Sequence, residues 1–538
     1  MSQIFEPPPV MLIPDSAPFT AEQRSWLNGF LAGWLGIAGD EAAAANPLAQ
    51  LAGQAGESAG TTEHEDESFP WHDPAIALDE RLDLAKEKPL PRRMMAAMAQ
   101  LDCGACGYVC KTYAEKLAAG EETSLTLCSP GGKETSKALK QLVKESKSEP
   151  RPAGSRSRSE TATSEATSAW SRQNPYPATV LRTFNLNAAG SEKQTTHVEL
   201  DLGDSGLTYE AGDSLGVYPT NCEELVESLL TRLAATGDEQ IELAGETISF
   251  REALTGRLCL SEVTEELLLC LAEAADDEEA NHLRGLVDDD GPLSGCDLLD
   301  VLRLFASARP APAAIAAVLS PLRPRLYSIS SSLAANPGQV HLTIGRVAWE
   351  HNGRVRKGVA STLFADRLAA GQRVRIFVQT SHGFRLPADA ASPVIMVGPG
   401  TGIAPFRAFL QERAAVAATG RNWLFFGDRN AATDFLYRDE LEAMQQAGRL
   451  SRLETAFSRD GDRKVYVQDR MRDAAGELWQ WLQEGASFYV CGDAKRMALD
   501  VDRTLHEIVA DQGGYSPAAA KEYVEHLSKT GRYQRDVY

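Results

Sequence analysis

The C-terminal part of the chain, from Pro393 onward, alternates short apolar runs with segments of helical periodicity. Val394-Ile-Met-Val397 is a continuous apolar run, typical of a buried strand. Residues 403–413 follow it closely and have the apolar spacing of a helix. Repetition of such strand and helix units predicts a parallel α/β sheet over residues 389–538.

The middle of the chain has a different pattern. Residues 174–220 and 322–388 contain alternating runs, such as 373–378, which predict strands with one buried face. Between these two parts, residues 221–318 are rich in leucine and have a helical period. We therefore expect a β-barrel domain over residues 174–388 that carries a helical insertion.

The N-terminal end contains one strongly amphipathic segment. Residues 20–37 place Trp26, Phe30 and Trp34 on one face of a helix. Such a face predicts a helix that docks on its own protein, or one that binds a partner.

Two polar segments separate the remaining parts. Residues 38–68 have the composition of a linker, and residues 76–101 are helix-like and lead into a group of cysteines. Residues 144–173 contain almost no large apolar side chain, which predicts a flexible tether. The predicted parts are an N-terminal helix with its linker, a small helical four-cysteine domain, the tether, the barrel and the α/β domain, over residues 1–75, 76–143, 144–173, 174–388 and 389–538.

Length and charge narrow the possible classes of protein. At 538 residues, the chain is too long for one core, so three or four domains are expected. The net charge of -21 argues against nucleic acid and anionic membranes as partners, and mildly for a basic protein partner.

The predicted location is the cytoplasm. The first residues lack the basic and apolar regions of a secretory signal, and no apolar run approaches the ~18–20 residues of a membrane span. The cysteines outside the N-terminal group are scattered, which favours reduced thiols in a large chain without a signal. They are Cys222, Cys259, Cys270, Cys296 and Cys491.

Two segments of the α/β domain predict a nucleotide site. The turn Gly398-Pro-Gly400-Thr401-Gly402 joins a predicted strand to a predicted helix, where backbone N–H groups can approach a pyrophosphate. Further along, a hydroxyl, a guanidinium and an ammonium group fall on one loop and suit a phosphate monoester, which favours NADPH over NADH. The residues of this loop are Ser458, Arg459, Lys464, Tyr466 and Gln468. A plain tight turn and a solvated basic loop are the alternatives.

Four cysteines form the candidate metal site. Cys103, Cys106, Cys110 and Cys128 have the spacing C-x2-C-x3-C-x17-C, with glycines between them. Three close thiolates and a distant fourth can wrap a [4Fe–4S] cluster. Structural zinc is the main alternative, although zinc sites more often contain two C-x2-C pairs. A [2Fe–2S] centre and reduced thiols without metal are the remaining possibilities.

The segments from about residue 174 to the C-terminus resemble, in order, the ferredoxin-NADP reductase module of the diflavin reductases. The closest likeness is to the flavoprotein component of NADPH-sulfite reductase. The segments that carry the resemblance are Arg325-Leu-Tyr-Ser328, Gly358-Val-Ala-Ser361, Gly398-Pro-Gly-Thr-Gly402, Ser458-Arg459, Lys464-Val-Tyr-Val-Gln468, Cys491-Gly-Asp493 and Arg532-Tyr-Gln-Arg-Asp-Val-Tyr538.

The resemblance implies a role for each matching residue. For FAD, it implies a pyrophosphate contact by Arg325, packing by Tyr327, a hydrogen bond from Ser328 near N5, and phosphate or wall contacts by Thr343, Gly345, Gly358, Val359, Ala360 and Ser361. For NADPH, it implies Cys491 beside the nicotinamide, Asp500 near the nicotinamide end, Asp536 in the hydride-transfer group and Tyr538 stacked on the flavin.

The chain departs from that family before residue 170. The family carries a flavodoxin-like FMN domain there, whereas this sequence has the four-cysteine segment, which over about residues 95–140 resembles small bacterial iron–sulfur domains. We therefore expect electrons to pass from NADPH through FAD and the cluster to a sulfite reductase hemoprotein. Other acceptors, such as a ferredoxin, a flavodoxin or a nitrite-reducing protein, remain possible. A zinc-bearing adaptor domain fused to an FAD reductase is the third hypothesis.

Overall fold

The computed structural model describes residues 69, 71, 76–100, 106, 108–128, 131–148, 170–287, 293–381 and 383–538. The helix predicted over residues 20–37, the segment 38–68 and Cys103 lie outside the described residues. Residues 70–538 form one unit, to which all of the following structure belongs.

The first sheet is antiparallel and has the strand order β6-β3-β10-β1-β2-β7. An additional bridge between Ile329 and Leu342 joins the ends of its two edge strands and closes the sheet into a barrel. Inward-facing residues such as Val180, Leu200 and Ile344 form its core. The strands are β1 (Tyr176–Asn185), β2 (Thr195–Asp201), β3 (Ser214–Tyr218), β6 (Arg325–Ser328), β7 (Gln339–Gly345) and β10 (Arg373–Gln379).

A helical insertion follows β3, as the leucine pattern predicts. Its helices are α7 (Glu223–Leu233), α8 (Phe250–Gly256), α9 (Glu265–Glu273), α10 (Asp277–Gly285), α11 (Leu298–Leu304) and α12 (Pro312–Val318). It also contains a hairpin, β4 (Gln240–Leu243) and β5 (Glu246–Ser249), which the helical prediction missed. The hairpin turns at Ala244 and Gly245, which both have positive φ and suit the twist of a two-residue turn.

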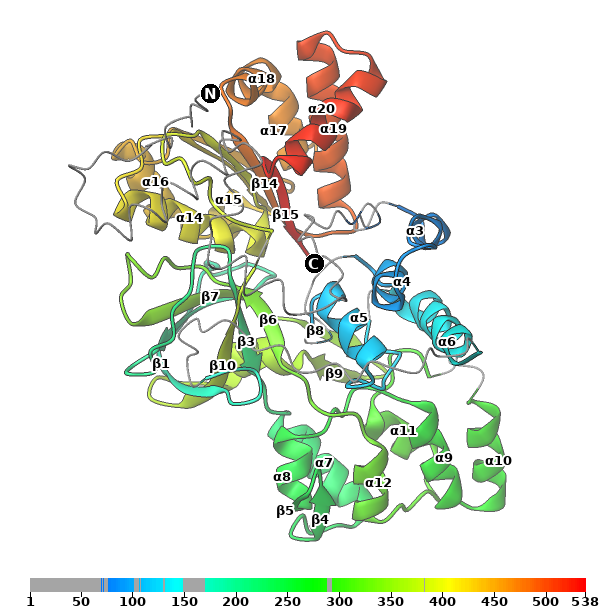
Figure 1. The fold of residues 1–538 in the computed structure, drawn as a ribbon. Coiled ribbons are helices and arrows are strands. Elements are labelled where there is room, and N and C mark those ends of the chain that lie inside the picture. The colour runs from blue at the N-terminus through cyan, green and yellow to red at the C-terminus, as the bar shows by residue number, and fades with distance from the viewer. Residues whose placement is uncertain are drawn as a thin grey trace, which may run out of the picture. The chain divides into compact units, whose positions relative to one another are not determined.

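A second hairpin lies after the barrel strand β7. Its strands, β8 (Ala348–His351) and β9 (Arg354–Lys357), turn at Asn352 and Gly353. The chain then forms α13 (Val359–Thr362) and η3 (Leu363–Arg367) before it returns to the barrel. This arrangement places the hairpin between the barrel and the insertion (Figure 1).

The C-terminal sheet is parallel, as predicted, and has the order β13-β12-β11-β14-β15. Alternate residues of each central strand face opposite cores, because Ile395 and Val397 pack with one set of helices and Met396 with the other. Helices therefore cover both faces of the sheet. Its strands are β11 (Val394–Val397), β12 (Asn422–Asp428), β13 (Arg452–Phe457), β14 (Ser487–Gly492) and β15 (Tyr533–Val537).

The helices of this domain fall into two groups. One face is covered by α14 (Ile403–Ala415) and α16 (Arg438–Gln446), and the other by α17 (Val467–Asp473), α18 (Ala475–Gln483), α19 (Met497–Gly513) and α20 (Pro517–Lys529). The short helices η4 (Gly400–Gly402) and α15 (Ala431–Asp434) follow β11 and β12. All these elements stand above the barrel in Figure 1.

The N-terminal described part is helical. Its helices are α3 (Leu78–Leu84), α4 (Leu90–Ala97), α5 (Cys110–Ala119) and α6 (Gly132–Ser148). Met94, Tyr113 and Leu139 are buried between them. Helix α6 continues past residue 143, where the tether was predicted to begin, and Trp170 packs edge-on against Tyr176 of the barrel. In the part of the chain that the structure describes, no helix is long and apolar enough to cross a membrane.

Candidate functional site

The largest site is a cavity of about 1790 Å³ lined by the barrel, the β8–β9 hairpin and the carboxyl ends of the parallel strands. Seventeen predicted site residues line it, from segments far apart in the sequence. They are Arg325, Tyr327, Ser328, Thr343, Gly345, Gly358, Val359, Ala360, Ser361, Gly400, Thr401, Ser458, Tyr466, Gln468, Asp500, Asp536 and Tyr538. Gly402, Arg459, Lys464 and Cys491 do not line the cavity.

A hydroxyl, a carboxylate and a thiol meet at one end of this cavity. The parallel register of β14 and β15 places Cys491 beside Asp536. Ser328, on barrel strand β6, donates its hydroxyl hydrogen to Asp536 Oδ2 at 2.5 Å, and Cys491 Sγ lies 3.8 Å from the same oxygen. Two domains therefore build this group together.

The thiol of Cys491 is fully buried directly behind the cavity wall. Burial raises its pKa well above the ordinary value of 9.0, and the adjacent Asp536 carboxylate raises it further. The sulfur is therefore a neutral thiol at physiological pH. It is a small polarizable group that can donate a hydrogen bond without adding charge to the site.

The C-terminal residue Tyr538 partly covers the same region. Its backbone is fixed to the end of β14, since its N–H donates to Gly492 O at 3.0 Å and its carbonyl accepts from Ala494 N at 3.1 Å. Its side chain is 45% exposed, and its hydroxyl lies 2.8 Å from Thr401 Oγ1. The ring is thus positioned by backbone contacts but remains accessible from solvent.

The glycine turn after β11 packs closely against this group. A side chain at Gly402 would place Cβ 2.1 Å from the carbonyl oxygen of Cys491, so only glycine fits. Gly400 has φ of +58°, which also favours glycine. The turn leads into α14, and its backbone N–H groups line the approach to the cavity.

The predicted phosphate loop contains a carboxylate bridge that the sequence did not indicate. One oxygen of Glu192 lies 2.7 Å from Arg459 Nη1 and 2.9 Å from Arg429 Nη1. Ser458 is held nearby by a hydrogen bond from its N–H to Asp428 O at 2.9 Å. Lys464 is exposed and stays outside this group. Two guanidinium groups around one oxygen form a good anion site.

The remaining nucleotide-site residues form two further contacts. Gln468 Nε2 donates to Asp500 Oδ2 at 3.4 Å, which brings these two predicted residues together. At the opposite end of the cavity, Trp349 of β8 is 50% exposed and lies among the lining residues. A half-exposed indole in such a position can stack on a flat aromatic ring.

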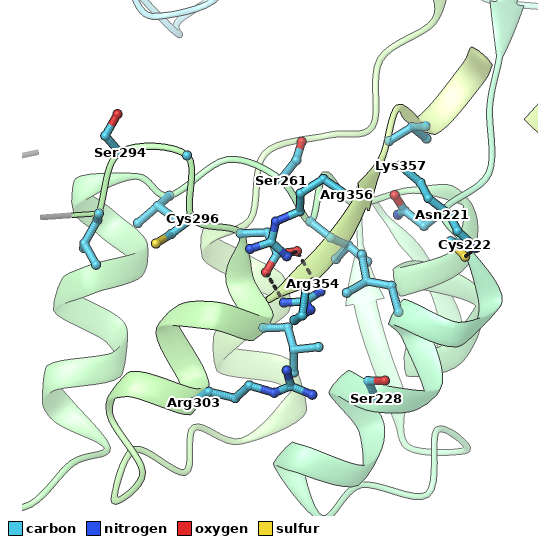
Figure 2. A pocket seen from close by; sticks show the side chains of 18 of the residues that line it. Asn221, Cys222, Ser228, Ser261, Ser294, Cys296, Arg303, Arg354, Arg356 and Lys357 are labelled. Atoms are coloured by element: carbon cyan, nitrogen blue, oxygen red, sulfur yellow. Dashed lines mark hydrogen bonds and ion pairs between the residues drawn. The ribbon is translucent and has the colours of Figure 1, made fainter. Parts of the chain in front are cut away.

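A second cavity, of about 750 Å³, lies between the insertion and the β8–β9 hairpin. Figure 2 shows Arg354 and Arg356 in its centre, with Cys296 on one side and Cys222 on the other. Arg354 Nη1 lies 2.7 Å from Asp300, and Arg356 Nη1 lies 2.6 Å from Asp297. Arg354 and Arg356 neutralise the carboxylates of Asp297 and Asp300, so these four side chains have a structural role.

That neutralisation also bears on a possible cation site. Ligand atoms of Cys296, Asp300 and His351 lie within 4.8 Å of one another. Because Arg354 and Arg356 both bind the Asp300 carboxylate, a cation would have to displace an arginine. We therefore assign no metal to these residues.

Three of the four predicted cluster cysteines are described, and they surround the start of α5. Cys110 begins this helix, Cys106 lies in the loop before it, and Cys128 is buried where the chain returns. The N–H of Ala99 donates to Cys128 Sγ at 3.4 Å. A Cβ at Gly131 would lie 2.1 Å from Thr135 Oγ1 and 3.0 Å from the same sulfur, so only glycine allows the backbone to pass this close to Cys128. Backbone donors and glycine-lined space suit a sulfur-rich cluster.

Sequence reasoning missed Glu192, Arg429 and Trp349. Arg429 directly follows β12, and side chains at the carboxyl ends of parallel strands commonly line ligand sites, so this position offered a usable signal. Trp349 stands in a short polar hairpin, where an exposed aromatic was also noticeable. Nothing local in the sequence connects Glu192 with Arg459, which is 267 residues away.

Comparisons with known proteins agree with the site geometry. Residues 168–363 match the family described as FAD binding domain, residues 396–503 match the oxidoreductase NAD-binding domain, and residues 98–130 match a putative Fe-S cluster family. The last match includes all four cysteines of the candidate cluster site.

Three relatives are named sulfite reductase [NADPH] flavoprotein alpha-component. The protein of Bacillus subtilis (strain 168) is 46% identical over 376 residues, that of Photorhabdus laumondii 45% over 373, and that of Vibrio cholerae (O395) 45% over 377. Each alignment covers 69% of this chain and 61–62% of the relative. The chain thus spans less than two thirds of these relatives. Its FAD- and NAD-binding domains are homologous to theirs, and the fold class predicted from the sequence is confirmed.

Proposed function

Starting from the kinship of its FAD- and NAD-binding domains with the sulfite reductase flavoproteins, we propose that this chain is an NADPH-dependent reductase. Electrons pass from NADPH through FAD and a cysteine-bound [4Fe–4S] cluster to a protein acceptor, a sulfite reductase hemoprotein. The observation that carries the proposal is the meeting of Ser328, Cys491 and Asp536 at the end of the large cavity. This group lies where a nicotinamide and a flavin would face each other.

Hydride transfer requires two rings held in contact, and it needs little acid–base chemistry from the protein. Ser328 and Asp536 fix each other across the two domains, so neither can drift from the contact point. The neutral Cys491 thiol lies behind the cavity wall, beside Asp536, and adds no second negative charge to that of this carboxylate. Tyr538 excludes water from the flavin and leaves when the nicotinamide enters.

The cavity fits FAD as its resident group. Its volume of about 1790 Å³ is large, and its lining combines the exposed Trp349 indole, the guanidinium group of Arg325 and a helix start that follows Gly358. Trp349 would hold the adenine by stacking, Arg325 would pair with the pyrophosphate, and the N–H groups of 358–361 would face the phosphates. Bound FAD accepts a hydride as an electron pair and releases the electrons singly.

The choice of NADPH rests on the anion site at the end of β12 and β13. Arg429 and Arg459 converge on one carboxylate oxygen of Glu192, and Ser458 lies beside them. A phosphate monoester would take the place of this carboxylate and meet both guanidinium groups. Glu192 therefore has to turn away when NADPH binds.

The cysteine domain supplies the single-electron outlet. The sequence spacing of Cys106, Cys110 and Cys128 and the backbone donor at Ala99 suit a [4Fe–4S] cluster, with Cys103 as the fourth ligand.

We also propose a cytoplasmic location, because the scattered cysteines, from Cys222 to Cys491, form no disulfide.

The proposal is tested with purified full-length protein in anaerobic buffer. We expect bound FAD, about four iron and four acid-labile sulfide per chain, and reduction by NADPH in strong preference to NADH. Addition of a sulfite reductase hemoprotein should then give NADPH-dependent sulfide production. Zinc in place of iron would contradict the cluster. Turnover with a ferredoxin and none with the hemoprotein would contradict the acceptor.

A further inference from the structure

We propose that Glu122 and Tyr108 of the cysteine domain dock on Arg323 of the barrel domain and on Arg172, which lies just before the barrel in the chain, and that this contact positions the cysteine loop to receive electrons from the FAD site. The inference rests on the proposed function. It adds a specific docking surface for the domain that stands in place of the FMN domain, and it names the residues that hold it.

The centre of the contact is an ion pair between domains. Glu122 Oε2 accepts a hydrogen bond from Arg323 Nη1 at 3.1 Å, and the two side chains are only 12% and 14% exposed. Burial opposes the charge on Glu122, but the N–H of Ser124 and the Arg323 guanidinium outweigh it and hold the pKa of Glu122 below its ordinary value. The carboxylate therefore stays charged and depends on its partner.

Tyr108 extends this contact to the cluster ligands. It lies between Cys106 and Cys110 in the chain, and its ring stacks with Tyr113 at 5.8 Å. The Arg172 guanidinium carbon lies 3.9 Å from the centre of the Tyr108 ring, and that of Arg323 lies 5.9 Å from it. Two barrel-side cations therefore bind the loop that carries the cysteines.

The barrel side of the contact leads directly to the FAD cavity. Arg323 precedes β6 by two residues, and β6 contributes Arg325, Tyr327 and Ser328 to the cavity wall. Arg325 also donates to the carbonyl oxygen of Arg323 at 3.2 Å. The same short segment thus faces the cysteine loop at one end and the cavity at the other.

Tyr218 secures the other barrel cation. Its hydroxyl donates to the carbonyl oxygen of Arg172 at 2.6 Å, and it stands at the end of β3, which pairs with β6. Arg172 and Arg323 are therefore both anchored to adjacent strands of the barrel. Both residues are therefore already held at the barrel surface before the cysteine loop docks.

A second, weaker contact supports the same orientation. Lys140 of α6 lies 3.5 Å from Glu265 at the start of α9, and both side chains are more than half exposed. Lys133, also on α6, lines the cavity beside the insertion. Exposed ion pairs of this kind contribute little to stability. Lys140 and Glu265 therefore assist the approach of the two domains, and the Glu122–Arg323 pair determines the position in which they dock.

Electrons and protons are conserved in the proposed transfer across this contact. NADPH and one proton convert FAD to FADH₂, and the electrons cross to the cysteine side one at a time. Two crossings reduce the oxidised cluster twice, with onward transfer between them, and release two protons as FAD is restored. A contact made of one buried ion pair and two cation–π contacts is small and specific.

The decisive experiment compares three full-length variants with the native protein. Arg323→Glu places like charges opposite each other, Glu122→Arg with Arg323→Glu restores opposite charges, and Arg251→Glu is the control. Arg251 pairs with Glu227 on the exposed surface of the insertion. Iron content and FAD content are measured first, so that each variant is known to be folded.

Hydrogen exchange is the first readout, because it reports docking without turnover. Peptides covering residues 108–124 and 215–218 should exchange about tenfold faster in Arg323→Glu, and protection should return in the double variant. The second readout is rapid mixing with NADPH. Electron arrival at the cluster should slow about tenfold or more in Arg323→Glu, whereas flavin bleaching keeps its native rate.

Unchanged exchange and unchanged electron arrival in Arg323→Glu would overturn the docking assignment, and so would slow transfer that the double variant fails to improve. If Arg323→Glu loses iron, Arg323→Gln replaces it and is judged by the same two readouts. Failure of the proposed function looks different. In that case the native protein itself lacks iron, or its flavin is not bleached by NADPH, while the exchange result still decides whether the two surfaces dock.

Discussion

Two contacts between domains lie on the proposed path of electron transfer, and they differ sharply in construction. Between the barrel and the α/β domain, buried Arg407 binds Ser330 O at 2.7 Å and Glu440 at 2.8 Å, while Tyr437 lies 2.6 Å from Thr343 Oγ1 and 2.8 Å from His197 Nδ1. Between the cysteine domain and the barrel, the contact consists of the Glu122–Arg323 ion pair and the Arg172 and Arg323 guanidinium groups over the Tyr108 ring.

The difference follows from what each contact has to transfer. A hydride moves only between atoms that are nearly touching, so the nicotinamide and flavin domains must be locked in one arrangement. A single electron tolerates a longer and looser approach. A thin contact therefore suffices for the cysteine domain, and it also lets the same domain face a protein acceptor after the electron has arrived.

The largest effect is expected from removing the cysteine outlet. Cys128→Ser replaces a buried cluster ligand, so iron should be lost and reduction of the protein acceptor should fall more than about 10³-fold. The rate of flavin reduction by NADPH should stay within about twofold of the native rate, because the substitution lies outside the contact between the barrel and the α/β domain. Iron assay and rapid mixing measure the two effects. Cys270→Ser is the matched control, since Cys270 lies in the insertion. Full acceptor turnover in iron-free Cys128→Ser would remove the cluster from the path.

The second-largest effect is expected at the contact between the barrel and the α/β domain. Arg407→Ala leaves Glu440 and the Ser330 carbonyl without their buried partner, which should lower the free energy of unfolding by about 3–5 kcal/mol. Arg472→Ala removes an arginine that is 45% exposed and should cost less than about 1 kcal/mol. Denaturant titration of both variants measures the difference. Equal losses would show that Arg407 contributes no more to stability than an exposed arginine does.

Hydride transfer itself should respond to Asp536→Asn. The variant weakens the bond from Ser328 and disturbs the meeting point of the two domains, so flavin reduction should slow about 10²-fold. Asp511→Asn, on the exposed end of α19, is the control. Stopped-flow absorbance measures both, and an unchanged rate in Asp536→Asn would exclude this carboxylate from the hydride site.

The pH dependence of the same step follows from Cys491. A raised pKa means that the neutral thiol persists as pH rises through 9.0, where an ordinary thiol is half ionised. Flavin reduction should therefore keep its native rate from pH 7 to about 9 and fall only above it. A decline centred below pH 9 would show that the thiol is not buried as described.

The smallest effect is expected at the anion site. Glu192→Gln removes the charge that competes with a phosphate for Arg429 and Arg459, so NADP⁺ should bind about three- to tenfold more tightly. NAD⁺ affinity should not change. Calorimetric titration with both nucleotides measures the pair of effects. Weaker NADP⁺ binding in Glu192→Gln would mean that Glu192 assists the nucleotide site.

How far the sequence predicted the structure depended on whether the relevant signal was local. The runs that became β7, β10, β11 and α14 carried their own periodicity, and the glycine turn was recognisable from its strand and helix neighbours. The β4–β5 hairpin was missed because its strands are only four residues long, too short for a period to stand out in a helical region.

The long-range contacts could not be predicted in the same way. Glu122 and Arg323 are 201 residues apart, and each is an ordinary charged residue in its own segment. The same holds for Glu192, whose partners lie beyond residue 428. By contrast, Cys491 and Asp536 were found together because the family resemblance supplied a pairing that the strand register then explains.

The most direct test of the account is an anaerobic titration of the native protein with NADPH, followed by optical and electron paramagnetic resonance spectra. We predict that the flavin bleaches and that a paramagnetic iron signal from the cysteine domain then develops, and that Arg323→Glu delays the second event and leaves the first unchanged. A bleached flavin without any iron signal, in protein whose cluster dithionite does reduce, would contradict electron delivery from FAD to the four cysteines.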